Sequence, residues 1–290
     1  MTAIATSRPL ATSVPRRRRR FPFGRTFATF VLLPICALMV FPFVWLILTS
    51  LREQNTVFSG PFFPRSFTAQ AYPEAWTSIS FPLHFWNSLW LTCATVLGVL
   101  IFATLSGYAF AKLDFPFKNV LYLLLLTTLM MPATALIIPL YQELKTLGLL
   151  NTQVGLLVLY VSGSAPFSMF LMRAFFQTLP DELVEAARAD GASESTIFRR
   201  VILPLAAPGL ATVVIFQFLQ TWNEFLMANT VLQDTQRLPL QPVLFNLLGQ
   251  YSTDWPVLTA GLTLSIIPVV LVYVRMQKRF VAGMTLGAVK

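Results

Sequence analysis

Few side chains in this sequence are of the types that carry out reactions. His84 is the single histidine, and the two cysteines, Cys36 and Cys93, both lie within apolar runs. A thiol in such a run packs as a small hydrophobic group, so the cysteines predict neither a disulfide framework nor a metal site. We expect His84 to be structural, because a lone histidine is more often structural than catalytic. With no histidine or cysteine cluster to build an activated nucleophile or a metal centre, no catalytic residue is predicted.

One acidic residue, Glu224, stands inside an otherwise apolar stretch. Other polar or amphipathic side chains accompany it: Gln217, Gln220, Trp222 and Asn223. An ionisable residue within an apolar span costs several kcal/mol and usually lines a path or a cavity. These five residues are therefore candidates for contact with a solute. The alternative is that they form hydrogen bonds to neighbouring helices or mark a gate near one end of the span.

A second polar pattern covers residues 179–207, where the sequence predicts two short helices. Pro180 and Asp181 are typical of a helix start, with the acidic side chain near the positive end of the helix dipole. Gly191 permits the left-handed conformation that ends this helix, and Ser193 can cap the next one. The segment therefore predicts a compact helix, glycine turn and second helix.

The second of these helices has one apolar stripe. Ile197, Val201 and Leu205 recur at every fourth position, with Phe198 and Ile202 beside them. We expect Pro204 to end this helix and Pro208 to open the apolar stretch that follows. An apolar stripe beside a charged face is typical of an element on which a partner docks.

The elements that must position these side chains are membrane helices. The chain has 290 residues, of which 56% are hydrophobic and 11% are charged, whereas a soluble domain carries about 25% charged residues. Its mean hydropathy is +0.67. This composition excludes an ordinary soluble enzyme and indicates an integral membrane protein.

Six apolar stretches are candidates for membrane helices. They cover residues 27–48, 86–111, 120–140, 154–176, 209–229 and 257–274. About 20 apolar residues cross the hydrocarbon core as a helix, and continuous apolar runs select helices over the alternating strands of a barrel. The predicted fold class is therefore all-α and polytopic, with six transmembrane helices within a membrane domain at residues 27–279.

The distribution of basic residues predicts the orientation. Seventeen of the 21 Lys and Arg fall on one side of the predicted spans and four on the other. The basic side is expected to be cytoplasmic, which places there the basic N-terminal tail (1–26), the 179–207 loop and the C-terminal tail (280–290). Residues 49–85 would then form an external cap. The run of five arginines at 16–20 is interpreted as an anchor to anionic lipid, not as a nucleic-acid arm.

Three segments resemble one family of transporters. The pattern Glu185-Ala186-Ala187, three residues, Gly191, nine residues, Val201-Ile202-Leu203-Pro204 resembles the EAA loop of ABC-importer permeases, with Val201 where that pattern usually has Ile. The chain end from Gln277 to Lys290 and the tetrapeptide Trp222-Asn223-Glu224-Phe225 are similar to the MalG-like carbohydrate-uptake subgroup. The resemblance covers all six predicted spans and implies the type I permease fold in the bacterial inner (plasma) membrane.

The resemblance also implies partners and a mechanism. In this family the loop is a coupling helix that docks on a cytoplasmic ATPase subunit. The implied coupling residues are Glu185, Ala186, Ala187, Asp190, Gly191, Ala192, Leu203 and Pro204. Partners would be a homologous permease, two ATPase subunits and an extracytoplasmic substrate-binding protein. The sequence contains no G-x-x-x-x-G-K-[ST] phosphate loop, so ATP and Mg would be bound by the ATPase subunits and the chain itself would carry no cofactor. The alternative for the loop is an amphipathic hairpin resting on lipid.

The implied solute is a sugar or oligosaccharide. Amides, carboxylates and an aromatic face, as in the cluster around Glu224, suit the hydroxyl groups and ring of a sugar. No Lys or Arg lies in the middle of a predicted span, which favours a neutral solute. Glycerol 3-phosphate, glycerophosphodiesters and amino sugars remain alternative cargoes. A secondary transporter is a remote alternative, because one buried Glu is thin support for a titratable relay.

Overall fold

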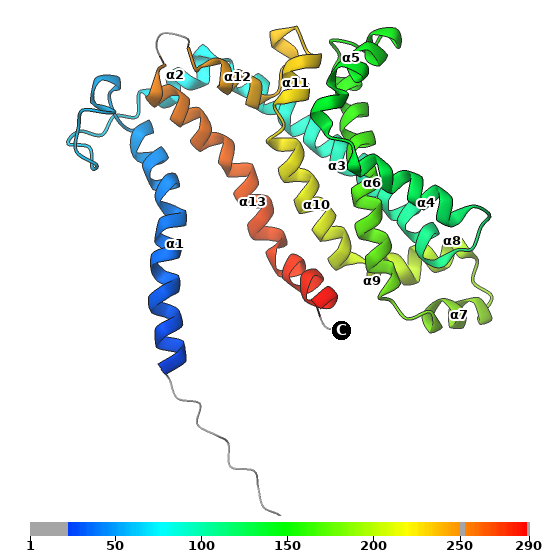
Figure 1. Cartoon of the computed structure of the whole chain (residues 1–290). Coiled ribbons are helices and arrows are strands. Elements are labelled where there is room, and N and C mark those ends of the chain that lie inside the picture. Colours follow the sequence, from blue (N-terminus) through cyan, green and yellow to red (C-terminus); the bar gives the residue numbers. More distant parts are fainter. Residues whose placement is uncertain (1–22, 250–252, 289–290) are drawn as a thin grey trace, which may run out of the picture. The chain divides into compact units, whose positions relative to one another are not determined.

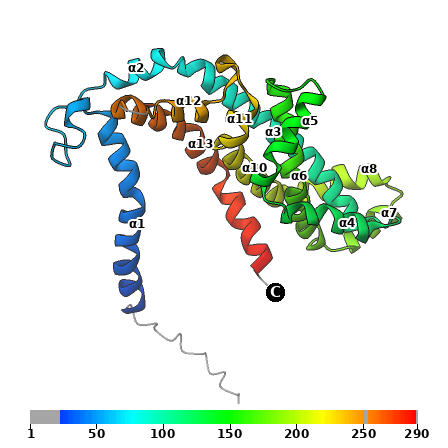
Figure 2. The same ribbon diagram turned by 45° about the horizontal axis from the view of Figure 1, so that its top comes forward.

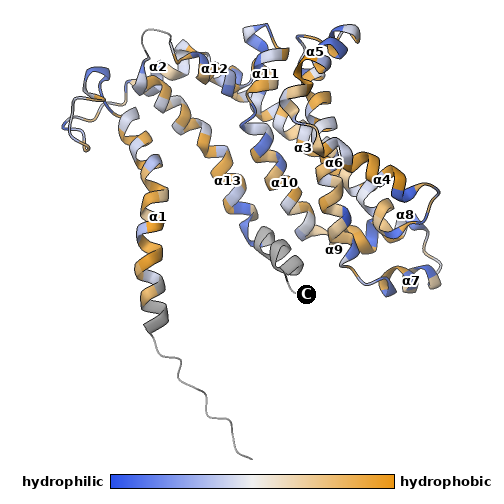
Figure 3. Cartoon of the chain, viewed as in Figure 1, coloured by the Kyte–Doolittle hydropathy of each residue, from blue (hydrophilic) through white to orange (hydrophobic). Residues whose placement is uncertain are grey.

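The computed structural model describes residues 23–249 and 253–288, and its regular elements in these ranges are all helices. The chain divides into two units, Met1–Trp45 and Leu46–Lys290, which are described separately. In the first unit the described element is α1 (Phe23–Ser50), whose last turn belongs to the second unit. Figure 3 shows that α1 is hydrophobic along most of its described length, and its large apolar side chains from Phe27 to Val44 are exposed. Such a helix suits a lipid environment.

Four long helices form the centre of the second unit (Figures 1 and 2). They are α3 (Phe81–Lys112), α6 (Gln153–Gln177), α10 (Ala207–Trp222) and α13 (Trp255–Ala288). The α3 helix packs most extensively on α6, and α10 packs on α3, α6 and α13. The close approach of α3 and α6 depends on Gly107, where a Cβ atom would lie 2.8 Å from the Cβ of Met172.

Replacing Gly107 by Leu is expected to destabilise the helix pair by about 3 kcal/mol, because the neighbouring α6 atoms include backbone that cannot move aside. Thermal unfolding in detergent measures the effect. Gly163→Leu is the matched control, since no atom lies within 4 Å of the Cβ position at Gly163. Equal stability losses in the two variants would contradict the predicted close contact.

Four of the six predicted spans are confirmed as continuous helices. The stretches 27–48, 86–111, 154–176 and 257–274 lie within α1, α3, α6 and α13. Among the described residues, four helices are long and apolar enough to cross a membrane, and the number rises to six if each of two bent pairs is one span. The helical content and the four to six candidate spans agree with the predicted all-α, polytopic class.

The predicted continuous span at 120–140 is wrong in one respect, because it is broken. It consists of α4 (Lys118–Thr127), η2 (Thr128–Met130), η3 (Ala133–Leu136) and α5 (Ile137–Thr146), with a 93° bend between the halves. The break falls at Met131-Pro132, where both residues are extended. Proline disfavours the helical conformation in the residue before it, which explains the position of the break.

The predicted span at 209–229 also ends early. The α10 helix stops at Trp222, and α11 (Leu226–Val231) begins after a break of three residues. The helix that precedes α10, Glu194–Leu205, meets it at 72°. No proline lies in the break at 223–225.

Shorter elements occupy the remaining chain. η1 (Gln54–Thr56) and α2 (Ala71–Ser78) follow α1, while η5 (Thr235–Arg237) and α12 (Leu240–Asn246) precede α13. The loop at 52–65 is held by Arg52, a buried side chain that donates to the carbonyls of Thr56, Val57, Pro61 and Phe62. The α2 helix packs on α13, which covers one end of the second unit.

Candidate functional site

The 178–206 segment forms the predicted helix, glycine turn and second helix. The first helix, α7 (Glu182–Ala189), ends in a Schellman motif, in which Ala192 N–H donates to the Ala187 carbonyl and Gly191 N–H to the Arg188 carbonyl, both at 3.0 Å. This closure requires a left-handed residue, and Gly191 has φ of +79°. The predicted role of Gly191 in stopping the helix is confirmed.

The second helix is made of α8 (Glu194–Thr196), the π-helical turn η4 (Ile197–Ile202) and α9 (Leu203–Leu205). Two details of the prediction are wrong. The Ser193 hydroxyl pairs with the Thr196 hydroxyl and does not cap the helix. Pro204 does not end the helix, which continues one residue further to Leu205 after the π-helical turn. Pro208 does open α10, as predicted.

The apolar stripe of the second helix packs on the chain itself. Ile197 and Ile202 are fully buried in a cluster with Tyr108 of α3 and Phe176 of α6. Val201 and Phe198 pack against the same cluster, and only Leu205 of the stripe is exposed. The apolar stripe of the second helix is therefore used within the chain, apart from Leu205, and is not a free docking face.

The face of α7 away from this cluster is polar and carries small residues. Val184 is buried and anchors the helix, and Ala187 and Ala192 pack partly against the same cluster. The other implied coupling residues of this helix and turn, namely Glu185, Ala186, Asp190 and Gly191, are exposed. Leu203 is half-buried and Pro204 is exposed at the far end of the second helix. The structure thus presents a short helix whose small side chains allow close approach.

Two polar clamps that sequence reasoning did not identify hold this segment on the helix pack. Lys112, at the end of α3, donates to the Leu179 carbonyl at 2.6 Å and to Asp181 at 2.5 Å. Glu194 accepts hydrogen bonds from Arg188 of α7 and from the Tyr108 hydroxyl. The hydrogen bond to Glu194 raises the pKa of the Arg188 guanidinium. Both clamps join residues more than five positions apart, so no local pattern reveals them.

Replacing Lys112 by Met is expected to lower stability by about 2 kcal/mol, because its side chain is 4% exposed and the loss of its amine leaves the Leu179 carbonyl without that donor. Thermal unfolding in detergent tests this. Asp181→Asn is the control and should cost less than about 1 kcal/mol, since Asp181 is 77% exposed. A larger loss in Asp181→Asn than in Lys112→Met would contradict the assignment.

The Glu224 cluster is located at the break between α10 and α11. The Glu224 carboxylate accepts hydrogen bonds from Met227 N–H at 2.7 Å, from Ala228 N–H at 3.0 Å and from the hydroxyl of buried Tyr160 in α6. It thereby satisfies donors of the first turn of α11 and ties that turn to α6. This explains why the span breaks here without a proline.

The other residues of this cluster separate into two groups. Trp222 is 2% exposed, donates to the Ser265 carbonyl of α13 and stacks on Phe218, so neither face of its ring is free in this structure. Gln217 is also buried; its amide donates to Thr221, and its oxygen has no hydrogen-bond partner. Gln220 and Asn223 are exposed. The structure therefore places Gln220 and Asn223 at the surface, leaves Glu224 half-buried at the break, and buries Trp222 and Gln217.

His84 is a structural residue, as predicted. It is buried in the first turn of α3, and its Nδ1 lies 2.8 Å from the Leu238 carbonyl. Asn87 donates to the same carbonyl, and Ser88 accepts from Leu240 N–H. These polar side chains fix the segment between α11 and α12 on α3.

Comparison with known proteins identifies the chain. The family of binding-protein-dependent transport system inner membrane components matches residues 100–286. The chain belongs to this family. The predicted resemblance to ABC-importer permeases is confirmed, and the chain is a multi-pass inner-membrane component of a bacterial ABC transporter. This family implies ATPase and binding-protein partners.

Curated relatives match the permease over most of its length. It is 32% identical over 253 residues to the diacetylchitobiose uptake system permease protein NgcG of Streptomyces coelicolor, with 86% of this chain and 84% of that protein covered. It is 35% identical over 261 residues to the arabinooligosaccharides transport system permease protein AraQ of Halalkalibacterium halodurans, covering 88% and 93%. The trehalose transport system permease protein SugB of Mycobacterium tuberculosis is 32% identical, covering 86% and 92%.

A solved structure has the same fold. The permease is 27% identical to a chain of a bacterial ABC transporter involved in the import of the acidic polysaccharide alginate, with a TM-score of 0.78 over 93% of this chain and 100% of that chain. A chain of the inward-facing MetNI methionine ABC transporter is 20% identical, with a TM-score of 0.57, 73% of this chain and 98% of that chain covered; it supports the fold alone. The predicted type I permease fold is confirmed.

Proposed function

We propose that this permease is one of two transmembrane subunits of an ABC importer that takes up a sugar or oligosaccharide. The observation that carries the proposal is that its relatives NgcG, AraQ and SugB are uptake or transport permeases for diacetylchitobiose, arabinooligosaccharides and trehalose. An extracytoplasmic binding protein delivers the solute, and a homologous permease completes the channel. The chain is not an enzyme.

In this proposal α7 is the coupling helix. A separate ATPase subunit binds ATP and Mg. The same subunit contacts the exposed face of α7 and its turn, which is formed by Glu185, Ala186, Asp190 and Gly191. Ala187, Ala192, Leu203 and Pro204 belong to the same motif; Ala187 and Ala192 pack against the buried cluster, and Leu203 is half-buried. Because the apolar stripe of the second helix is buried in the core and this helix meets α10 at 72°, a displacement of α7 by the ATPase is transmitted to α10 through these contacts. Both termini and this segment then lie in the cytoplasm.

The solute path in this proposal runs past the break between α10 and α11. Irregular backbone at membrane depth is tolerated where it lines a cavity or is buried in protein, and broken helices often form transport sites. Gln220 and Asn223 supply exposed amides, and Glu224 fixes the break. Trp222 and Gln217 form the buried wall behind them.

Reconstitution with the partner permease, the ATPase and the binding protein tests the proposed function. Proteoliposomes should accumulate a neutral disaccharide or oligosaccharide only when ATP and the binding protein are both present. A panel with trehalose, diacetylchitobiose and arabinooligosaccharides on one side and glycerol 3-phosphate on the other separates the cargo classes. Uptake of glycerol 3-phosphate alone, or uptake without ATP, would overturn the proposal.

A further inference from the structure

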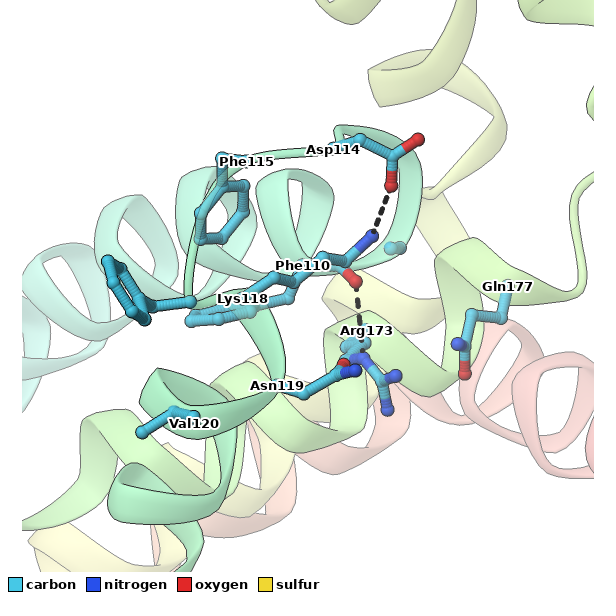
Figure 4. A pocket seen from close by; sticks show the side chains of 10 residues that line it. Phe110, Asp114, Phe115, Lys118, Asn119, Val120, Arg173 and Gln177 are labelled. Carbon is cyan, nitrogen blue, oxygen red and sulfur yellow. Dashed lines mark hydrogen bonds and ion pairs between the residues drawn. The ribbon is translucent and has the colours of Figure 1, made fainter.

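A cavity of about 460 Å³ lies at the end of the helix pack that also carries α7, away from the break at residues 223–225 (Figure 1). Figure 4 shows the side chains that line it. It is formed where α3 ends, α4 begins and α6 ends. Its polar lining consists of Asp114, Lys118, Asn119, Arg173 and Gln177. This volume falls within the range of about 300–1,000 Å³ that is usual for small-molecule sites.

The Arg173 guanidinium is fixed on one side and free on the other. Its Nε donates to the Phe110 carbonyl at 3.3 Å, and its carbon lies 4.0 Å from the centre of the Tyr122 ring. Among the residues that the structure describes, no carboxylate lies within ion-pair distance of Arg173. In Figure 4 its terminal nitrogens lie between the side chains of Asn119 and Gln177. A half-buried cation held in this way is available to an anion from outside the chain.

Lys118 provides a second cation. Its Nζ donates to the Leu113 carbonyl at 2.7 Å and lies 3.4 Å from the Asp114 carboxylate (Figure 4). The Asp114 side chain is fully exposed to solvent, so this ion pair is weak and leaves the cavity with a net positive charge. The α4 helix also begins in the lining, and the positive end of its dipole adds to the field.

The rim of the cavity is apolar and faces outward. Phe117 and Val120 line it and are 75% and 56% exposed. Leu121 and Leu124 continue this exposed apolar surface along α4, which is half of one candidate membrane span. A cationic interior beside an exposed apolar helix matches the two halves of a phospholipid, with the headgroup in the cavity and the acyl chains along α4.

We propose that this cavity binds the phosphate of an anionic phospholipid from the leaflet on the side of α7. Arg173 and Lys118 neutralise the phosphate, and Asn119 and Gln177 donate hydrogen bonds from their amides. A free phosphate ion shares this chemistry but makes no use of the exposed apolar rim. The site does not depend on which solute the importer carries.

The experiment uses the full chain with its transporter partners in nanodiscs made of equal parts phosphatidylglycerol and phosphatidylcholine. Native mass spectrometry after release into detergent measures which lipid the protein retains. Each cation near the surface contributes about fivefold in lipid preference. The wild type should therefore retain phosphatidylglycerol more than about tenfold over phosphatidylcholine, and the double variant Lys118→Gln/Arg173→Gln should retain the two lipids about equally.

Matched variants separate the site from general charge effects. Arg275→Gln removes one positive charge from an exposed position on α13 outside the lining, and it should leave the preference unchanged. If the double variant does not assemble, Lys118→Gln alone should lower the preference about fivefold, while Arg173→Lys should keep most of it because the charge remains. An unchanged phosphatidylglycerol excess in the variants that remove charge from the cavity would overturn the proposal. So would stabilisation of the lipid-free wild type by inorganic phosphate without any lipid preference, which would assign the cavity to a free anion.

Discussion

Replacing Gly191 by Val is expected to reduce binding-protein-dependent uptake more than tenfold while the chain still inserts into the membrane. Gly191 has φ of +79°, and no atom lies within 4 Å of the position a Cβ would take. The penalty is therefore conformational: a left-handed backbone costs an L-residue roughly 1–2 kcal/mol, and a β-branched one is a true outlier. We expect the two hydrogen bonds of the Schellman motif that ends α7 to break, and the proposed contact surface for the ATPase to be lost with them. Uptake per ATP hydrolysed is the measurement.

Gly148 offers a matched control for this variant. It also has a positive φ, of +69°, and open space around its Cβ position, but it lies between α5 and α6, outside the 178–206 segment. Gly148→Val carries the same backbone strain and should leave the ratio of uptake to ATP hydrolysis unchanged. Gly191→Asn should retain more transport than Gly191→Val, because Asn tolerates the left-handed region. Normal coupling in Gly191→Val would count against a role for α7 in energy transfer.

Replacing Glu224 by Ala is expected to destabilise the permease by about 3 kcal/mol, because the Met227 and Ala228 N–H groups and the buried Tyr160 hydroxyl all lose their acceptor. The turn that begins α11 should loosen from α6, and uptake should fall with it. Thermal unfolding in detergent and the KM for uptake are measured together on the same variant.

Two further variants separate a structural role of Glu224 from contact with the solute. Tyr160→Phe removes a single donor and should cost about 1 kcal/mol. Glu224→Gln keeps one carbonyl oxygen and should lie between the wild type and Glu224→Ala in stability. If both Glu224 variants unfold at the wild-type temperature and only KM changes, the carboxylate serves the solute and the helix cap is unimportant.

Local patterns in the sequence were sufficient for the parts of the site that depend on neighbouring residues. Gly191 was recognisable because only glycine takes a left-handed conformation at little cost, and Pro208 because its fixed φ suits the first turn of a helix. The apolar stripe of the second helix was visible in its spacing, but its destination was not. It packs into the chain's own core at Ile197 and Ile202, so most of the stripe is not available to a partner.

The two broken spans show where hydropathy is insufficient. The average hydropathy of residues 120–140 does not reveal the 93° bend at Met131-Pro132, although the proline itself is a local signal for a break. The break after Trp222 contains no proline to mark it. Glu224 accepts from the Met227 and Ala228 N–H groups, which are close by in the chain, whereas its contact with the Tyr160 hydroxyl spans 64 positions. Glu224 stood out in the sequence because it is an acidic residue in an apolar stretch. The sequence left open whether Glu224 contacts the solute or forms hydrogen bonds to neighbouring helices.

The sequence by itself determined that this is a polytopic helical membrane protein with a helix-turn-helix between its fourth and fifth spans. Composition, the length of apolar runs and local turn residues were sufficient, because each depends on residues close together in the chain. Only the tertiary structure decided which side chains face each other. Lys112 donates to Asp181 at the start of α7, and Glu194 accepts from both α7 and α3. Trp222 is buried in the core and does not line a solute path in this structure. The direction in which a helical side chain points depends on how its helix is rotated relative to the neighbouring helices. That rotation depends on packing between segments that are far apart in the sequence, so local patterns do not determine it.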